Sequence, residues 1–545
     1  MTCQQCDAID FLSILPQQPL VQRRNIVQHT QHRWHKTMSS LRASADTGCS
    51  FCSSALRELS QSLPGTALLE LEEEDVYLTM LPWPDHSNVG FSTVQGNTEL
   101  IAYCGPKDFT TEILDDPLEL RRIAIARFHV CVERNERERE TGTMDKQVFP
   151  FGVISGRTIC QDAASQQCFD IARSWFNRCL SGSKSGCGKH VWCHHVSWDK
   201  KSAITPQSPT KVFIPSRTIN VGTIDSGKAP FLQIHSQNDD SGPKSVPISW
   251  ATLSHCWGGS ALMVTSTHTL EEHTREIPMD RMPQTFLDAV NITRELGIEH
   301  LWIDSLCIVQ DSEEDWVNES SKMAQVYRYS ILNIAAEASR NAGDGIFKPR
   351  TFRRLLAKFP LRWRGELLVF PLLRNWMESL CGDASILSKR GWVLQENLLS
   401  PRTLHFGLEQ IFWSCASTII SEGDMAPLPK EVIGRLSADW NWHLSKRFLT
   451  LQGNLSEIEP RSPYALEIWY NRWYEVVTNY SARHLTRQSD VFPALAGLAQ
   501  AFILRLQDDY IAGLFAGNLH HGILWHTDLF DEVKRAIPYR APTWS

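Results

Sequence analysis

Two cysteine pairs near the N-terminus have the spacing of a metal-binding site. Two residues separate Cys3 from Cys6, and two separate Cys49 from Cys52. Structural Zn²⁺ sites use such pairs to clamp distant segments of a chain. The separation of about forty residues between the pairs is longer than the usual zinc-ribbon spacing. Two interpretations therefore stay open: the four thiols hold a structural zinc ion, or they are free thiols in helix packing.

Histidines and further cysteines extend this chemistry. Three histidines between the two pairs are alternative ligands, namely His29, His32 and His35. A second group of cysteines and histidines follows a helix that we expect at 161–180, and a structural loop is the favoured interpretation for it. This group comprises Cys179, Cys187, Cys193, His194 and His195.

Reactive side chains also follow three apolar runs in the middle of the chain. The runs at 250–254, 300–303 and 331–336 are predicted strands. The residues after them are His255, Cys256, Trp257 and Gly258, then Asp304, Ser305, Cys307, Gln310 and Asp311, and finally Glu337. In an open parallel sheet, ligands bind beyond the carboxyl ends of the strands. We therefore expect these side chains, from distant segments, to converge on one crevice.

The segment 390–396 adds four further candidates, Arg390, Trp392, Gln395 and Glu396. On a helix, Trp392 and Glu396 are i and i+4 neighbours and share a face, with Gln395 beside them. An aromatic surface next to a carboxylate suits a planar base or a ribose. The alternative is that Arg390 and Glu396 join a buried ion-pair network.

The strand-end candidates have structural interpretations too. Trp257 and Gly258 would form a packed turn, and His255 would be a core histidine with satisfied hydrogen bonds. Asp304 would cap the next helix or bind nearby backbone N–H groups. Cys307 lies in an apolar run, which favours a buried, unreactive thiol over a nucleophile.

The elements around these residues alternate between strand and helix. A helix is expected at 283–297, with Pro in its first turn and Gly at its end. Another is expected from Ser312, because three acidic residues fill its first turn, where the helix dipole favours them. The three predicted strands lie in longer apolar segments, at 248–259, where the strand runs into a Gly turn, at 300–309 and at 331–339. This order predicts an α/β domain with a parallel, doubly wound sheet.

Shifts in composition divide the chain further. We expect a Cys/His-rich segment at 1–60, an α+β accessory region at 61–221, a linker at 222–247, the central domain at 248–420 and a mainly helical region at 421–545. A length of 545 residues suits several structural units better than one core.

The overall composition is that of a soluble globular protein, with 42% hydrophobic and 21% charged residues. The formal net charge of -7 offers no basic surface for nucleic acid. The N-terminus lacks a signal-peptide pattern, and no run of about 18 apolar residues predicts a membrane-spanning helix. We therefore expect a cytoplasmic protein, with cysteines present as thiols or metal ligands.

Three sequence blocks resemble the fungal heterokaryon-incompatibility (HET) domain family. They are ATLSHCWGG, the stretch from PQTFLDAVNITRELGIEHLWIDSLCIVQD into EDWVNESSKMAQVYRYSILNIAAEAS, and RGWVLQENLLSPRTLHF with FWSC after it. Two positions depart from the family pattern, His255 where many members carry Tyr and Val309 where Asn is common. The resemblance implies an effector or signalling module in fungal nonself recognition and regulated cell death, triggered through protein partners or self-association.

The resemblance also implies a fold and a chemistry. HET domains are similar to the Toll/interleukin-receptor (TIR) fold, a flavodoxin-like parallel sheet, and some TIR domains cleave NAD with a glutamate at the sheet edge. By that analogy NAD would be a substrate, and Glu396 and Asp304 would be the catalytic residues, with Glu337 as a further candidate for holding the ribose. No phosphate-cradling Gly loop of the Rossmann or Walker type occurs. The remaining alternative is a catalytically inactive interaction scaffold.

Overall fold

The computed structural model describes much of the chain in separate stretches. These are residues 2–9, 11, 32–62, 71–82, 98–104, 124–133, 159–181, 213–225, 227–235, 248–258, 263–350, 356–361, 365–371, 385–415, 419–423 and 463–524. The chain forms two compact units. The first comprises 1–161, 350–375 and 420–429, and the second comprises 162–349, 376–419 and 430–545.

The first unit is built on an antiparallel sheet. Among the described residues its strand order is β1-β2-β3-β4-β11-β10. The strands are β1 (His32–His35), β2 (Val76–Pro82), β3 (Thr98–Cys104), β4 (Ala124–Glu133), β10 (Ala357–Leu361) and β11 (Gly365–Pro371). β11 pairs antiparallel with both β4 and β10. This hairpin from far along the chain belongs to the N-terminal unit, whereas the sequence placed it in the central domain.

Short helices complete the first unit. They are α1 (Gln4–Asp7), α3 (Met38–Asp46) and α4 (Ser50–Ser62), and α4 packs against β4. Phe51 at the start of α4 is fully buried, and its ring lies 4.8 Å from that of Trp34 and 5.1 Å from that of Phe128. The core is thus a single aromatic and aliphatic layer between one sheet and these helices.

The second unit contains a mixed sheet. Its strands follow the order β13-β12-β9-β7-β8-β5-β6 in the part of the chain that is described. They are β5 (Arg217–Asn220), β6 (Phe231–Ile234), β7 (Trp250–Ser254), β8 (His300–Trp302), β9 (Leu332–Ala335), β12 (Arg402–Phe406) and β13 (Ile411–Cys415). Strand β14 (Ile419–Ser421) comes where the chain passes between the units.

The predicted parallel sheet is right at the centre and wrong at both edges. β12, β9, β7 and β8 run parallel to one another. β13 pairs antiparallel with β12, and β5 pairs antiparallel with both β8 and β6. A short turn joins β12 to β13, closed by the Gly407 N–H donating to the Gln410 carbonyl at 3.1 Å. So short a connection permits only an antiparallel pair. The fold is mixed α/β.

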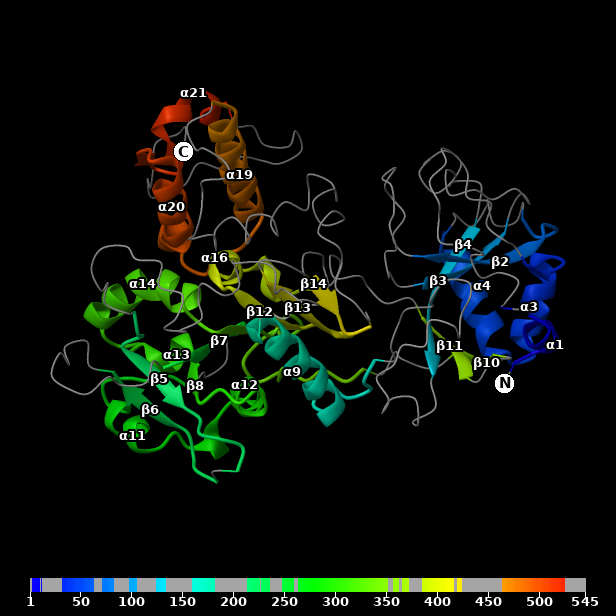
Figure 1. Cartoon of the computed structure of the whole chain (residues 1–545), viewed down its shortest axis with the longest axis horizontal. Coiled ribbons are helices and arrows are strands. Elements are labelled where there is room, and N and C mark those ends of the chain that lie inside the picture. The colour runs from blue at the N-terminus through cyan, green and yellow to red at the C-terminus, as the bar shows by residue number, and fades with distance from the viewer. Residues whose placement is uncertain are drawn as a thin grey trace. The chain divides into compact units, whose positions relative to one another are not determined.

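Helices cover the parallel strands as the sequence predicted. They include α9 (Gln166–Ser181), α11 (Leu270–Arg275), η1 (Met279–Arg281), α12 (Gln284–Glu295), α13 (Asp304–Cys307), α14 (Glu313–Arg328), η2 (Leu387–Lys389) and α16 (Gly391–Leu399). α12 packs with α9, and α14 packs with α16 (Figure 1). The Ser312 hydroxyl accepts from the Asp315 N–H and so caps α14. The expected strand at 300–309 ends early, because the chain turns into α13 at Asp304.

The C-terminal part of the second unit is mainly helical, as expected. It contains α19 (Pro463–Ser481), η5 (Gln488–Val491), α20 (Pro493–Leu506), the hairpin β15 (Tyr510–Ile511) and β16 (Leu514–Phe515), η6 (Ala516–Asn518) and α21 (Leu519–Gly522). Trp473 of α19 is fully buried, and its indole N–H donates to the Gly513 carbonyl at 2.7 Å. α20 packs against α14 and α16, which joins this part to the sheet.

One described stretch, Gln488–Leu506, is long and apolar enough by composition to cross a membrane. Its mean hydropathy is 1.2, and 39% of it is buried. This is weak evidence for a membrane span, because the core helix of a soluble protein meets the same criterion. Here the stretch comprises η5 and α20, which pack against the rest of the unit.

Candidate functional site

The ends of the parallel strands β7 and β8 are tied together by a tryptophan and an aspartate. The indole N–H of Trp257 donates to Oδ2 of Asp304 at 2.8 Å. The other oxygen of Asp304 accepts the Ser305 N–H at 2.8 Å, which starts α13. Asp304 therefore binds a nearby backbone N–H, which is one of the two structural interpretations proposed for it, and it also fixes the side chain of Trp257 after β7.

Gly258 allows the chain to leave β7 sharply. Its φ is +73°, a left-handed conformation that side chains rarely adopt. A Cβ at this position would lie 2.3 Å from the Cβ of Asn341. Both the turn and the close approach therefore require glycine.

Glu396 lies on α16 and is 6% exposed. Burial, with a smaller contribution from the charge of Asp304, raises the pKa of its carboxyl group to about 7. Hydrogen bonding to Ser254 and Tyr327 and the charge of Arg390 act in the opposite direction. At neutral pH this carboxyl group is thus divided between its acid and its anionic form.

Arg390 and His255 complete the cluster. The Arg390 guanidinium donates to the backbone carbonyl of His255, which holds the start of α16 against the end of β7. The imidazole of His255 is buried and packs edge-on against Phe286 at 5.1 Å between ring centroids. Burial lowers the pKa of His255 to about 4, so the ring is neutral at physiological pH. Within the described residues its Nε2 has no hydrogen-bond partner.

These contacts bring residues from three of the predicted segments to the carboxyl edge of the sheet. We define the Glu396 cluster as the group formed by Ser254, His255, Asp304, Tyr327, Arg390 and Glu396. Ser254 and Tyr327 were not predicted as members. Ser254 is the last residue of β7, and Tyr327 lies near the end of α14. The sequence signal for both residues was a hydroxyl-bearing side chain at a position where the pattern places the side chain in the apolar interior.

Glu337 belongs to a different network. Its carboxylate accepts the Ser385 hydroxyl at 2.5 Å and contacts Nδ1 of His405 at 2.7 Å. Nε2 of His405 lies 2.8 Å from the hydroxyl of Ser414. All four side chains are buried. This chain of hydrogen bonds joins the ends of β9, β12 and β13, and its sequence signal was the polar residues within the apolar strands at 402–415.

Other predicted crevice residues have structural partners. Cys307 is fully buried, and burial raises its pKa to about 12, which agrees with an unreactive thiol. The Gln310 amide donates to the carbonyls of Asp304 and Ile308, each at 3.1 Å. Asp311 is exposed and accepts the N–H and hydroxyl of Thr267 at 2.7 Å. These contacts shape the loop after α13.

Trp392 and Gln395 contact the C-terminal helices. The Trp392 indole donates to Asp490 at 3.1 Å, and the Gln395 side-chain oxygen accepts the Gly497 N–H at 2.8 Å. The neighbouring groups that shift the pKa of Glu396 are Ser254, Arg390, Asp304 and Tyr327. The expected surface of an aromatic ring beside the carboxylate is therefore not formed, because the two side chains have different partners.

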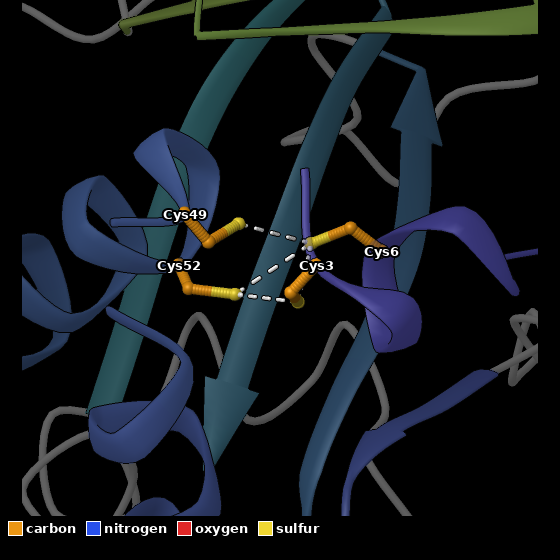
Figure 2. Close-up of side chains that lie close together, drawn as sticks. All are labelled: Cys3, Cys6, Cys49 and Cys52. Carbon is orange, nitrogen blue, oxygen red and sulfur yellow. Dashed lines mark hydrogen bonds between the residues drawn. The ribbon is translucent and has the colours of Figure 1, made fainter. Parts of the chain in front are cut away.

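The four N-terminal cysteines gather in the first unit (Figure 2). Cys6 Sγ lies 3.6 Å from Sγ of Cys3, Cys49 and Cys52, and all four sulfurs lie within 4.8 Å of one another. A disulfide would need about 2.05 Å. A tetrahedral ion with metal–sulfur bonds of ~2.3 Å separates its sulfurs by about 3.8 Å. The four thiols are therefore at metal-binding distance.

Electrostatics within this cysteine cluster favour a bound cation. Hydrogen bonds from Cys52 and Cys6 lower the pKa of Cys49, so its thiolate is stabilised by neighbouring S–H groups. Those same contacts raise the pKa of Cys6 and Cys52, and burial raises it further. A second thiolate would lie close to the first in a buried place, where the two negative charges repel each other. A divalent cation bound between them would offset this repulsion.

Of the predicted alternative ligands, the structure describes His32 and His35, and neither is grouped with the four cysteines. His35 lies beside the cluster, with Nε2 at 3.5 Å from Sγ of Cys52. His29 lies outside the described residues, as do Cys187, Cys193, His194 and His195 of the second group. Cys179 of that group is described, and its sulfur accepts from Nε of Arg402 at 3.2 Å.

The second unit is thus a mixed α/β domain with a parallel centre and a buried polar cluster at its carboxyl edge. Residues 250–396 match the family described as heterokaryon incompatibility protein (HET). The chain therefore carries a heterokaryon-incompatibility domain, as its sequence blocks predicted. Neither the curated proteins nor the solved structures contain a match.

The close approach at Gly258 can be tested with a matched pair of glycines. Gly297 has a similar φ of +71°, but a Cβ there would meet nothing within 4 Å. Gly297→Ala should cost only the left-handed strain of about 1–2 kcal/mol. Gly258→Ala should cost about 1–3 kcal/mol more from the clash with Asn341. Urea denaturation of the full chain measures both, and equal losses would contradict the proposed contact.

The raised pKa of Glu396 predicts a pH-dependent stability. The folded state holds the proton better than the unfolded state, whose carboxyl pKa is 4.5, so stability present below pH 4.5 is lost as pH rises toward 7. The full shift corresponds to about 3 kcal/mol. Glu396→Gln should remove this loss, so the variant should gain on the wild type between pH 5 and 8. Urea denaturation midpoints of the two proteins measure this gain. A difference between them that stays constant from pH 5 to 8 would contradict the assignment.

Proposed function

We propose that this protein is an effector or signalling module in fungal nonself recognition and regulated cell death, and that its HET domain is the working part. The observation that carries the proposal is the family match over 250–396. The role implied by that family is triggered when chains are brought together by a protein partner or by self-association. We propose the cytoplasm as the place of action.

The Glu396 cluster is the part of the domain that we assign to this role. Its members come from the ends of β7 and β8 and from α14 and α16, and all lie inside the matched range. A buried carboxyl group and a buried imidazole whose Nε2 has no partner among the described residues both cost stability. Natural cores retain such groups mainly where function requires them.

The NAD-cleaving alternative has less support. Glu396 is 6% exposed, and Trp392, which was expected to flank it, bonds to Asp490. A ribose would need a carboxylate that it can reach and a ring on which the base can stack. The glycohydrolase hypothesis therefore stays a prediction, and so does the inactive scaffold.

Inducible expression in a fungal host tests the role and separates the alternatives. We expect wild-type chain to arrest growth without release of nicotinamide. Glu396→Gln keeps the neutral, hydrogen-bonding form of the side chain and should still arrest growth if the domain acts by interaction. Glu396→Ala leaves a cavity and should weaken arrest. The exposed Glu314→Gln on α14 is the control.

Two outcomes would overturn the proposal. Wild-type expression at normal abundance without any arrest would remove the cell-death role. The NAD-cleaving enzyme would be favoured instead if the wild type releases nicotinamide and Glu396→Gln, at unchanged protein level, abolishes both this release and the growth arrest.

We also propose that the four N-terminal cysteines hold a structural Zn²⁺. Four soft thiolates at tetrahedral spacing suit zinc and exclude hard cations such as Mg²⁺ and Ca²⁺. The ion would join α1 to the start of α4 and so close the N-terminal end of the first unit. Cys3 is half-buried and the other three are buried, so the proposed ion would be largely shielded from water.

Metal analysis of the full chain tests the zinc proposal. The full chain is needed because α4 packs on the distant strand β10, where the rings of Phe51 and Phe359 lie 5.8 Å apart. We expect about one Zn²⁺ per chain, lost in Cys6→Ser and Cys52→Ser with a fall in stability, because metal-binding free energy is folding free energy. Cys104→Ser, at a buried thiol of the same unit outside the cluster, should keep its zinc. Wild-type protein that stays metal-free in zinc-containing buffer would refute the site.

A further inference from the structure

We infer that His35 and Ser40 are outer-shell positioning groups of the cysteine cluster: Ser40 sets the tautomer of His35, and His35 donates its Nε2–H to the sulfur of Cys52. The inference rests on the zinc site proposed above and deepens it. It assigns to the cluster two residues that supply no metal-binding atom.

The geometry brings three elements together at this point. His35 is the last residue of β1, Cys52 lies in the first turn of α4, and Ser40 lies in α3. Nε2 of His35 is 3.5 Å from Sγ of Cys52, and Nδ1 is 3.2 Å from the hydroxyl of Ser40. His35 is 1% exposed, so both ring nitrogens depend on these partners rather than on water.

An irregularity in β1 directs His35 toward the cysteines. Side chains of a regular strand alternate between its faces, yet the neighbours Trp34 and His35 are both buried. The pairing with β2 shifts between Arg33 and His35: Arg33 lies opposite Tyr77, and His35 lies opposite the adjacent Val76. This is the pattern of a β-bulge, which redirects a side chain at the point where it occurs.

The chemistry of a zinc thiolate determines where the proton sits. A metal-bound cysteine sulfur has no proton, so it can only accept a hydrogen bond. Nε2 of His35 must then carry the hydrogen, and Nδ1 must accept from the Ser40 hydroxyl. Ser40, His35 and Cys52 thus form one directed chain of hydrogen bonds.

This series of hydrogen bonds explains how the first unit can hold a site with four anionic ligands. Four thiolates around Zn²⁺ leave a net charge of about −2, which is costly in a buried place. An N–H···S hydrogen bond withdraws charge from one sulfur and fixes its orientation. Outer-shell donors of this kind typically contribute roughly 10–100-fold to metal affinity.

Zinc release from the full chain, measured with a chromogenic chelator, tests the inference. His35→Phe keeps the volume and removes the donor, and we expect it to retain one zinc per chain but to release it roughly 10–100-fold faster. His35→Gln retains an N–H donor and should restore part of the difference. Ser40→Ala should speed release by a smaller factor, because the ring stays but its tautomer is no longer fixed.

Trp34→Phe is the matched control. Trp34 is the buried neighbour of His35 in the same bulge and packs against it at 4.7 Å between ring centroids. Its indole N–H has no partner within the described residues. The substitution perturbs local packing without touching a sulfur, so zinc release should match that of wild type.

Cobalt substitution distinguishes the ways in which the inference could fail. Co²⁺-loaded wild type should show the sulfur-to-metal charge-transfer bands of four thiolates, shifted in energy in His35→Phe because the hydrogen bond to one sulfur is lost. Release from His35→Phe at the wild-type rate with an unchanged spectrum would overturn the role of His35 while leaving the zinc site intact. A three-thiolate wild-type spectrum would make His35 a ligand and overturn the outer-shell assignment. Wild type that binds neither ion would overturn both proposals.

Discussion

The burial of the Glu396 carboxyl group against the end of β7 is the constraint on which the second unit depends. A carboxyl group removed from water is tolerated only when hydrogen bonds and opposite charge compensate it. Ser254, Tyr327 and Arg390 lower the pKa of Glu396 and so favour its charged form, and the hydroxyls of Ser254 and Tyr327 donate to Oδ1 of Asn333 at 3.2 Å and to the Leu253 carbonyl at 3.3 Å. Arg390 can do so only because the backbone carbonyl of His255 anchors it. Placing that carbonyl requires the chain to turn sharply after β7, which in turn requires Gly258.

This dependence gives a physical reason for the clustering of the family motifs. The block at 251–259 supplies the strand end and the turn, the block around 304 ties the neighbouring strand to it through Trp257, and the block at 390–396 supplies the buried acid and its cation. Each block thus contacts or orients residues of the others.

In the first unit, short elements are held in place in a different way. Its α1 and β1 are each four residues long, too short to bury much apolar surface, so the cysteine cluster holds them in place.

The sequence allowed the centre of the fold to be predicted because its signals are local. The cap at Ser312, the helix at 283–297 and the apolar strands depend on residues near one another in the chain. The cysteine spacing likewise predicted the cluster in the first unit. The antiparallel edges were missed because strand direction depends on which strands pair, which no local pattern records. The direction of Trp392 was missed because the partner that decides it, Asp490, lies almost a hundred residues away. His35 was predicted as an alternative ligand because its spacing from the cysteines does not reveal the bulge in β1, which places its Nε2 3.5 Å from Sγ of Cys52.

The hairpin β10–β11 has a consequence for how the chain is made. The segment lies within the matched family range, yet its strands complete the sheet of the first unit. During synthesis β4 is available long before residue 371 has left the ribosome, so its outer edge stays unpaired while more than two hundred further residues are added. An open strand edge of this length invites pairing with other chains. The N-terminal unit therefore cannot finish folding before the HET domain is synthesised. A nascent chain stalled within the HET domain would expose the unpaired edge of β4, which β11 covers in the folded protein.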